Sequence, residues 1–98
     1  MMYEDKKIKL IVAGGRDFTD QHIANQWLDH LLQNYTRQEV VIVCGKARGA
    51  DSCGEKWAID NEVDVWEFIP DWNGLGKGAG HIRNREMGNA ATHLLAFF

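Results

Sequence analysis

Short apolar runs alternate along the chain with longer segments in which apolar residues recur every three or four positions. Residues 8–13 and 40–44 are almost continuously apolar and are followed by glycine, which is typical of a strand buried in a parallel sheet. Residues 63–69 alternate apolar and acidic side chains, which predicts an edge strand ended by Pro70. Residues 92–98 form a further apolar run, so the pattern predicts four strands.

The segments between the first three strands have the spacing of amphipathic helices. Thr19 or Asp20 can cap the first helix. Its apolar residues lie three or four positions apart: Ile23, Trp27, Leu28, Leu31, Leu32 and Tyr35. The second helix begins at Ala50 or Asp51 and ends at Asn61. Three tryptophans are expected in the core or at an interface: Trp27, Trp57 and Trp66.

A polar loop rich in glycine runs to Gly80, and a third helix covers about residues 81–91. Strands and helices therefore alternate with short connections. Because crossovers between parallel strands are right-handed, this order predicts a parallel sheet with helices on both faces. A doubly wound sheet starts in the middle, so we expect the strand order 3-2-1-4 in a three-layer α/β fold.

The bulk composition excludes several classes of protein. The net charge of −3 argues against a dedicated nucleic-acid-binding or membrane-surface protein. Cys44 and Cys53 have no Cys or His nearby at metal-binding spacing, so we expect reduced thiols in a cytoplasmic protein without a metal or other cofactor. The apolar runs are shorter than a membrane span, and residues 1–9 do not resemble a signal peptide.

Three segments place glycine, arginine and a carboxylate or amide together: residues 14–17, 45–51 and 77–85. Six of the eleven Lys and Arg residues lie in them: Arg16, Lys46, Arg48, Lys77, Arg83 and Arg85. Glycine lets a ligand approach the backbone, and arginine forms paired hydrogen bonds with phosphate. Since all three segments are expected at the carboxyl ends of parallel strands, they predict an anion pocket between the first and fourth strands.

The expected ligand-binding residues come from these segments and from the loop before the third helix: Gly14, Gly15, Arg16, Gly45, Arg48, Gly49, Asp51, Trp72, Gly80, Arg83 and Asn84. Alternatives stay open for most of them. The glycines can serve tight turns, and the arginines can pair with Asp17, Asp51 or Glu86. Asp51 is more readily an N-cap or a partner of Arg48, because a carboxylate repels phosphate. Trp72 can stack on a base or pack against the protein.

Five segments together resemble the YspA-like branch of the SLOG superfamily: V-A-G-G-R-D-F at 12–18, C-G-K-A-R-G-A-D at 44–51, W-A at 57–58, D-W at 71–72 and A-G-H-I-R-N-R-E-M at 79–87. The resemblance extends over residues 9–98. That superfamily is a Rossmann-like group that includes the cytokinin-activating phosphoribohydrolases (LOG proteins) and the DNA-uptake protein DprA. The resemblance implies a Rossmann-like fold and a nucleotide or nucleotide-derived ligand, where the residues alone indicate only an anion.

Enzymatic members of the superfamily carry an arginine in a helix segment that Arg83, Asn84 and Met87 match here. They also carry a P-G-G-x-G-T-x-x-E motif after the fourth strand, whose glutamate takes part in cleaving an N-glycosidic bond. The 98 residues contain no such motif. The expectation is therefore one SLOG-like domain over residues 1–98 that lacks the C-terminal part of longer relatives, with Arg83 catalytic only if the protein is an enzyme.

Two functions follow from this resemblance. The first is binding of a nucleotide-derived phosphate ligand by a sensor or regulatory domain, because several members of the branch are proposed sensors in bacterial and phage conflict systems. The alternative is hydrolysis of a nucleoside phosphate or a nucleotide sugar. It needs an acid or base, for which the chain offers three candidates: Asp17, Asp51 and Glu86.

The fourth predicted strand carries Leu94, Leu95, Phe97 and Phe98. No further strand follows to pair with its outer edge, and an open apolar edge favours pairing with another chain. We therefore expect a homo-oligomer with the fourth strand or the third helix at the contact. The alternative is a monomer in which the helices already cover these side chains.

Overall fold

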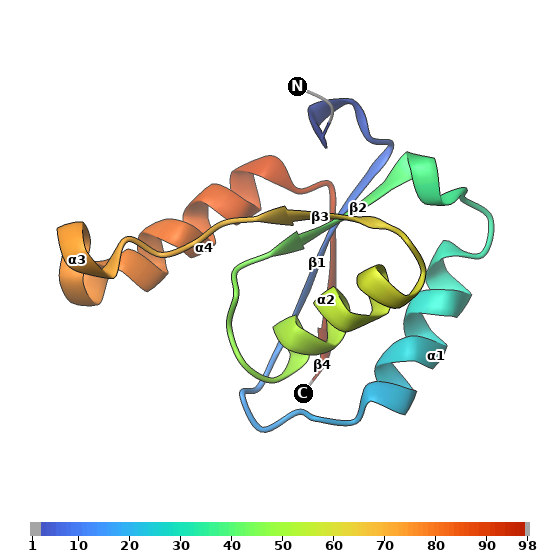
Figure 1. Ribbon diagram of the computed structural model, residues 1–98, viewed down its shortest axis with the longest axis horizontal. Coiled ribbons are helices and arrows are strands. Elements are labelled where there is room, and N and C mark those ends of the chain that lie inside the picture. The colour runs from blue at the N-terminus through green and yellow to red at the C-terminus, as the bar shows by residue number, and fades with distance from the viewer. Residues whose placement is uncertain (1–2, 98) are drawn as a thin grey trace.

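The fold is built on a parallel sheet, seen in a computed structural model that describes residues 3–97 (Figure 1). Its four strands lie in the order β3-β2-β1-β4, as the sequence predicts. Their bounds are β1 (Ile8–Gly14), β2 (Val40–Cys44), β3 (Asp64–Glu67) and β4 (His93–Phe97). All pairings are parallel, so the carboxyl ends of the strands share one edge of the sheet.

Helices cover both faces of this sheet (Figure 1). The longer ones are α1 (Gln21–Leu32) and α2 (Ala50–Asp60) on one face and α4 (Ala79–Ala90) on the other. Shorter turns complete the chain: η1 (Tyr3–Asp5), η2 (Arg37–Glu39), α3 (Trp72–Leu75) and η3 (Gly76–Gly78). Within residues 3–97, no helix has the length and apolar character needed to span a membrane.

The hydrophobic core lies between the sheet and the pair α1 and α2. Alternate residues of β1 point into it, and the parallel register brings Leu10 beside Ile42 and Val12 beside Leu95. All five residues of β2 are buried, because helices cover this central strand on both faces. Phe18, just before α1, stacks on Phe97 of β4 at a ring distance of 4.5 Å. This contact closes the core at the carboxyl edge of the sheet.

Two predicted boundaries were wrong. The strand predicted over 63–69 is shorter, Asp64–Glu67, because its partner β2 ends at Cys44; the amide of Phe68 makes one more bond, to the Cys44 carbonyl at 2.7 Å. The predicted loop before residue 81 contains α3 and η3, and α4 already begins at Ala79. The carboxylate of Asp71 caps α3 by accepting from the amide of Gly74 at 2.9 Å. Phe98 lies outside the described residues.

Most of the predicted apolar face of the first helix is exposed. Leu28 and Leu32 are buried, as predicted, and Ala24 is buried beside them. Four other apolar residues of that segment are exposed: Ile23, Trp27, Leu31 and Tyr35. The apolar stripe is wider than the strip of the helix that α2 and the sheet cover. Trp57 is therefore buried in the core, whereas Trp27 is not, which leaves an interface as the other place expected for Trp27.

Gly54 fixes how closely α2 approaches β1. A Cβ built on Gly54 would lie 2.7 Å from Cβ of Val12, and Val12 is itself buried in the core. A methyl group there must push the helix away from the sheet. Gly88, on the exposed face of α4, has no such neighbour and makes a matched control.

We expect Gly54→Ala to lower the free energy of unfolding by about 1–3 kcal/mol through overpacking against Val12. Gly88→Ala should instead raise it by roughly 0.5–1 kcal/mol, because alanine restricts the unfolded chain. Urea unfolding followed by tryptophan fluorescence measures both. Equal stability of the two variants would show that α2 does not pack as closely as described.

Candidate functional site

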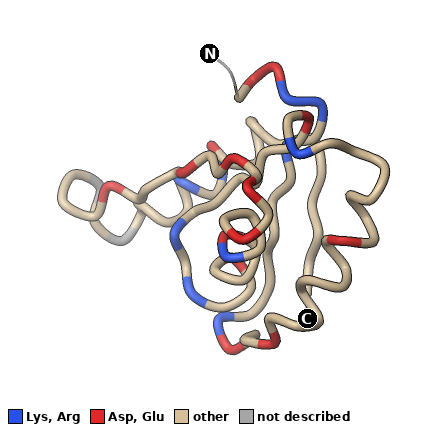
Figure 2. Tube along the Cα trace, turned by 45° about the vertical axis from the view of Figure 1, so that its right-hand side comes forward, with Lys and Arg blue, Asp and Glu red and all other residues tan. Residues whose placement is uncertain are grey.

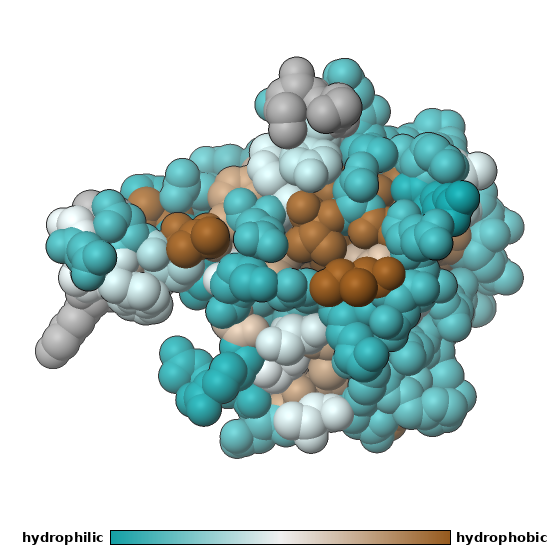
Figure 3. Space-filling model, viewed as in Figure 1, coloured by the Kyte–Doolittle hydropathy of each residue, from teal (hydrophilic) through white to brown (hydrophobic). Residues whose placement is uncertain are grey.

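Three loops meet at the carboxyl edge of the sheet and enclose two adjoining cavities. The first has a volume of about 360 Å³, and seven predicted site residues line it: Gly14, Arg16, Gly45, Arg48, Asp51, Arg83 and Asn84. The second, of about 490 Å³, shares four of these residues and adds two more predicted ones: Trp72 and Gly80. Figure 3 shows a hollow between the arm formed by α3 and α4 and the loop after β2. Gly15 and Gly49 line neither cavity.

Arg16, Arg48 and Arg83 line both cavities and come from three different loops or helices. Among the described side chains, none of the three has a carboxylate oxygen within 4.0 Å. Five other cations of the chain do have such a partner: Lys6, Lys7, Arg37, Lys46 and Lys56. The positive charge at the boundary of the cavities is therefore not neutralised by these carboxylates, and Figure 2 shows basic positions along the loops after β1 and β2.

Arg83 reaches the site from α4, on the opposite face of the sheet from α2. Its guanidinium donates to the carbonyl of Gly45, and its Nε donates to Oδ1 of Asn84 at 2.7 Å. A Cβ on Gly45 would lie 2.7 Å from Cδ of Arg83 and 2.9 Å from the sulfur of Met87. Gly45 thus makes room for Arg83, whose remaining N–H groups are available to a ligand.

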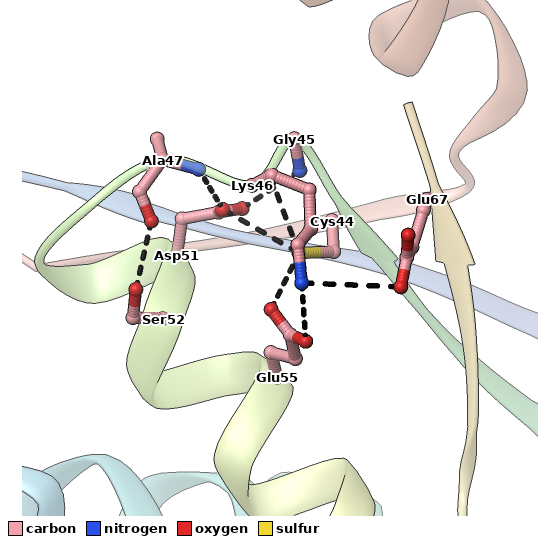
Figure 4. A network of polar contacts seen from close by, with 8 residues as sticks. All are labelled: Cys44, Gly45, Lys46, Ala47, Asp51, Ser52, Glu55 and Glu67. Carbon is pink, nitrogen blue, oxygen red and sulfur yellow. Dashed lines mark hydrogen bonds and ion pairs between the residues drawn. The ribbon is translucent and has the colours of Figure 1, made fainter. Parts of the chain in front are cut away.

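Asp51 holds the loop after β2 in place (Figure 4). Its carboxylate accepts hydrogen bonds from the amide of Gly45 at 3.1 Å and from the amide of Ala47 at 2.7 Å. The N-cap of α2 is Gly49 instead, and no ion pair joins Asp51 to Arg48. The two roles expected for Asp51 are therefore wrong, because the carboxylate folds back onto the loop that precedes its own helix.

Gly14 and Gly49 let the loops approach one another. At Gly49, with φ 78°, a Cβ would lie 2.2 Å from the carbonyl oxygen of Gly15 and 2.7 Å from Cα of Arg16. At Gly14, with φ 152°, it would lie 2.2 Å from the carbonyl oxygen of Phe97. Only glycine fits such close backbone contacts at positive φ. These glycines act by packing: they let the loop that carries Arg16 lie beside the first turn of α2.

Trp72 forms part of the wall of the second cavity. Its side chain is 59% exposed, although it sits on the short helix α3. A Cβ on Gly80 would lie 3.6 Å from the Trp72 ring, an ordinary van der Waals distance, so the indole lies beside the start of α4. The ring leaves an accessible surface beside the arginines, as stacking on a base requires.

Lys46 lines the second cavity, and its side chain belongs to a network of polar contacts that sequence reasoning missed (Figure 4). Its ammonium is 2.7 Å from Glu55 and 3.9 Å from Glu67. The hydrogen bond between Lys46 and Glu55 lowers the pKa of Glu55 and raises the pKa of Lys46. Lys46 is therefore neutralised by these carboxylates. The spacing of residues 46, 55 and 67 in the sequence does not predict these ion pairs, because the three side chains come together only in the folded protein.

The thiol of Cys44 lies beneath the same loop. Burial raises its pKa, and the nearby carboxylates of Asp51 and Glu55 act in the same direction. The Sγ lies within hydrogen-bonding distance of both carboxylates, at 3.5 Å from Asp51 and 3.4 Å from Glu55, and its one proton can be donated to either. Cys44 is accordingly a protonated thiol that packs in the sheet. Of the remaining basic residues predicted near the site, Arg85 lines neither cavity, and the side chain of Lys77 lies outside the described part of the chain.

A parallel sheet of order 3-2-1-4, with arginine-lined cavities at its carboxyl edge, defines a Rossmann-like ligand-binding domain. The chain belongs to the YspA, cpYpsA-related SLOG family, whose sequence profile matches residues 8–74. This match confirms the resemblance and indicates a nucleotide-type ligand in general. It includes the loops after β1 and β2 and ends before α4, which carries Arg83.

The chain is similar to the Gene 61 protein of Mycobacterium phage D29. The two are 31% identical over 97 residues, which cover 92% of this chain and 75% of the phage protein. No solved structure matches the chain.

We expect Glu55→Gln to lower the free energy of unfolding near pH 7 by about 1 kcal/mol, the upper range for a partly exposed ion pair. Because the folded-state pKa of Glu55 lies below its ordinary value of 4.5, this stabilisation is present above that pH. It is lost as the pH falls through the folded pKa, so the difference between wild type and variant should shrink below pH 4.5.

Urea unfolding over this pH range tests the expectation. Glu62→Gln is the control, because its partner Arg37 is 54% exposed and Glu62 is 74% exposed, so its effect should be smaller. A stability difference for Glu55→Gln that does not change with pH would contradict the role given to this ion pair.

Proposed function

We propose that the two cavities bind a phosphate-bearing nucleotide derivative, with the phosphate at the boundary that they share. The observation that carries this proposal is the convergence of Arg16, Arg48 and Arg83 without carboxylate partners among the described side chains. Cations held together repel one another, and a bound anion removes that cost. Guanidinium groups from three directions suit the tetrahedral oxygens of a phosphate.

The surroundings of the arginines support a ligand with non-ionic groups on either side of its phosphate. The first cavity is also lined by the apolar residues Ile11 and Ala13 of β1. The second offers the exposed ring of Trp72 together with Ile69. A base stacked on Trp72 would leave the phosphate within reach of the arginines. This arrangement supports a nucleotide over inorganic phosphate.

The same geometry supports sensing or regulation better than hydrolysis. Cleavage of an N-glycosidic bond by general acid–base catalysis needs a carboxyl group that can reach the reacting atoms. Of the three candidates in the chain, only Asp51 lines a cavity, and its carboxylate is held by two backbone amides. Asp17 and Glu86 line neither cavity. The binding domain we propose therefore changes the state of the protein and leaves its ligand intact.

We expect the protein to bind AMP, ADP, NAD or ADP-ribose more tightly than adenosine, as measured by calorimetry. Arg16→Ala and Arg48→Ala should each weaken binding about tenfold or more, because a charged hydrogen bond contributes roughly 1.5–3 kcal/mol. Arg85→Ala is the matched control, since it removes an exposed arginine of α4 that lines neither cavity.

Two results would contradict the proposed function. One is equal affinity for adenosine and for its phosphates, and the other is an equal loss of affinity in Arg85→Ala. Arg83→Ala should also weaken binding, but its unfolding must be measured in parallel because the guanidinium contacts Gly45. Product analysis of the bound nucleotide separates binding from hydrolysis, and release of free base would contradict the sensor role.

A further inference from the structure

The two edges of the sheet differ in how they are protected. β3 carries two exposed acidic residues, Asp64 and Glu67, and Asp64 pairs with Lys6 at 3.1 Å. β4 pairs with β1 on one side, and no described strand pairs with its other side. Its residues, His93–Phe97, include no Lys, Arg, Asp, Glu or Pro. Charges and proline are what keep an edge strand from pairing with another chain, so β4 is open to such pairing.

An apolar helix face lies beside this open edge. α1 runs alongside β4 in both Figure 1 and Figure 2. Ile23, Trp27 and Leu31 follow one another at intervals of four residues and are 39%, 51% and 44% exposed. Leu95 of β4 is only partly buried, whereas Val12, its register partner in β1, is 1% exposed. The core is thus incompletely covered on the side of β4.

The charge on this face favours one kind of partner. Along α1, Asp29 is the only Asp, Glu, Lys or Arg, and its carboxylate already accepts a hydrogen bond from Trp57 Nε1 at 2.9 Å. A charged partner would find no opposite charge here, whereas two copies of the face would meet without repulsion. In a dimer with a two-fold axis, the same surface of each subunit forms the contact, so a face without net charge can pair with its own copy.

We propose that a second copy of this chain docks on the face formed by the outer edge of β4 and by Ile23, Trp27 and Leu31 of α1. With the two-fold axis perpendicular to the sheet, β4 pairs antiparallel with its copy and α1 packs on the copy's α1. The sheet then continues through both subunits. This dimer does not depend on the proposed function, because the residues of this face line neither of the two cavities.

Sedimentation velocity over the micromolar range tests this interface. We expect a dimer, and we expect Trp27→Lys to raise the dimer dissociation constant about tenfold or more, because it places a charge in the contact. Leu31→Gln should act in the same direction. The matched control is Ile59→Lys, which places the same charge on α2 at a residue that is 63% exposed. All variants should unfold at urea concentrations close to that of the wild type.

Three outcomes would overturn the proposal. The first is a wild-type protein that stays monomeric at every concentration tested. The second is a dimer that Trp27→Lys and Leu31→Gln leave intact, which would put the contact elsewhere. The third is an equal weakening by Ile59→Lys, which would reflect added charge alone.

Discussion

The close backbone contact between the loop after β1 and the first turn of α2 is the constraint on which the rest of the site depends. The carbonyl of Gly15 accepts from the amide of Ala50 at 3.4 Å, and Gly49 has no space for a side chain. This contact brings Arg16 and Arg48 to one place. Arg83 arrives from the other face of the sheet because Gly45 leaves room for it. Gly45 and Gly49, which the sequence suggested as ligand contacts, therefore serve to let the loops and Arg83 approach one another.

Two basic residues in the loop after β2 have different surroundings. Both Lys46 and Arg48 line the second cavity, but Lys46 pairs with Glu55 and Glu67, whereas Arg48 has no carboxylate partner among the described side chains. The carboxylate of Asp51 accepts hydrogen bonds from the backbone amides of Gly45 and Ala47 in the same loop. The loop can thus be rigid through its acidic contacts and still present a positive charge to a ligand. A net charge of −3 says nothing of this local arrangement.

Much of the fold could be predicted because buried parallel strands leave continuous apolar runs, and because such strands place their following loops at one edge. That reasoning predicted Arg16, Arg48 and Arg83 at one edge of the sheet, where all three line the two cavities. It missed the partners of Lys46, since Glu55 and Glu67 approach it only across a helix and a neighbouring strand. It could not decide whether Trp27 lies in the core or at an interface, because apolar spacing shows that a helix has an apolar face and does not show how much of that face its neighbours cover.

The most direct test of the account is to observe the arginine side chains while ligand is added. In a titration with ADP followed by nuclear magnetic resonance, the Nε–Hε signals of Arg16, Arg48 and Arg83 should shift together and saturate at one affinity. Those of Arg37, which pairs with Glu62, and of Arg85 should stay unchanged. Signals that do not move, or shifts as large at Arg37 and Arg85 as at the other three, would contradict the claim that these cavities hold the phosphate.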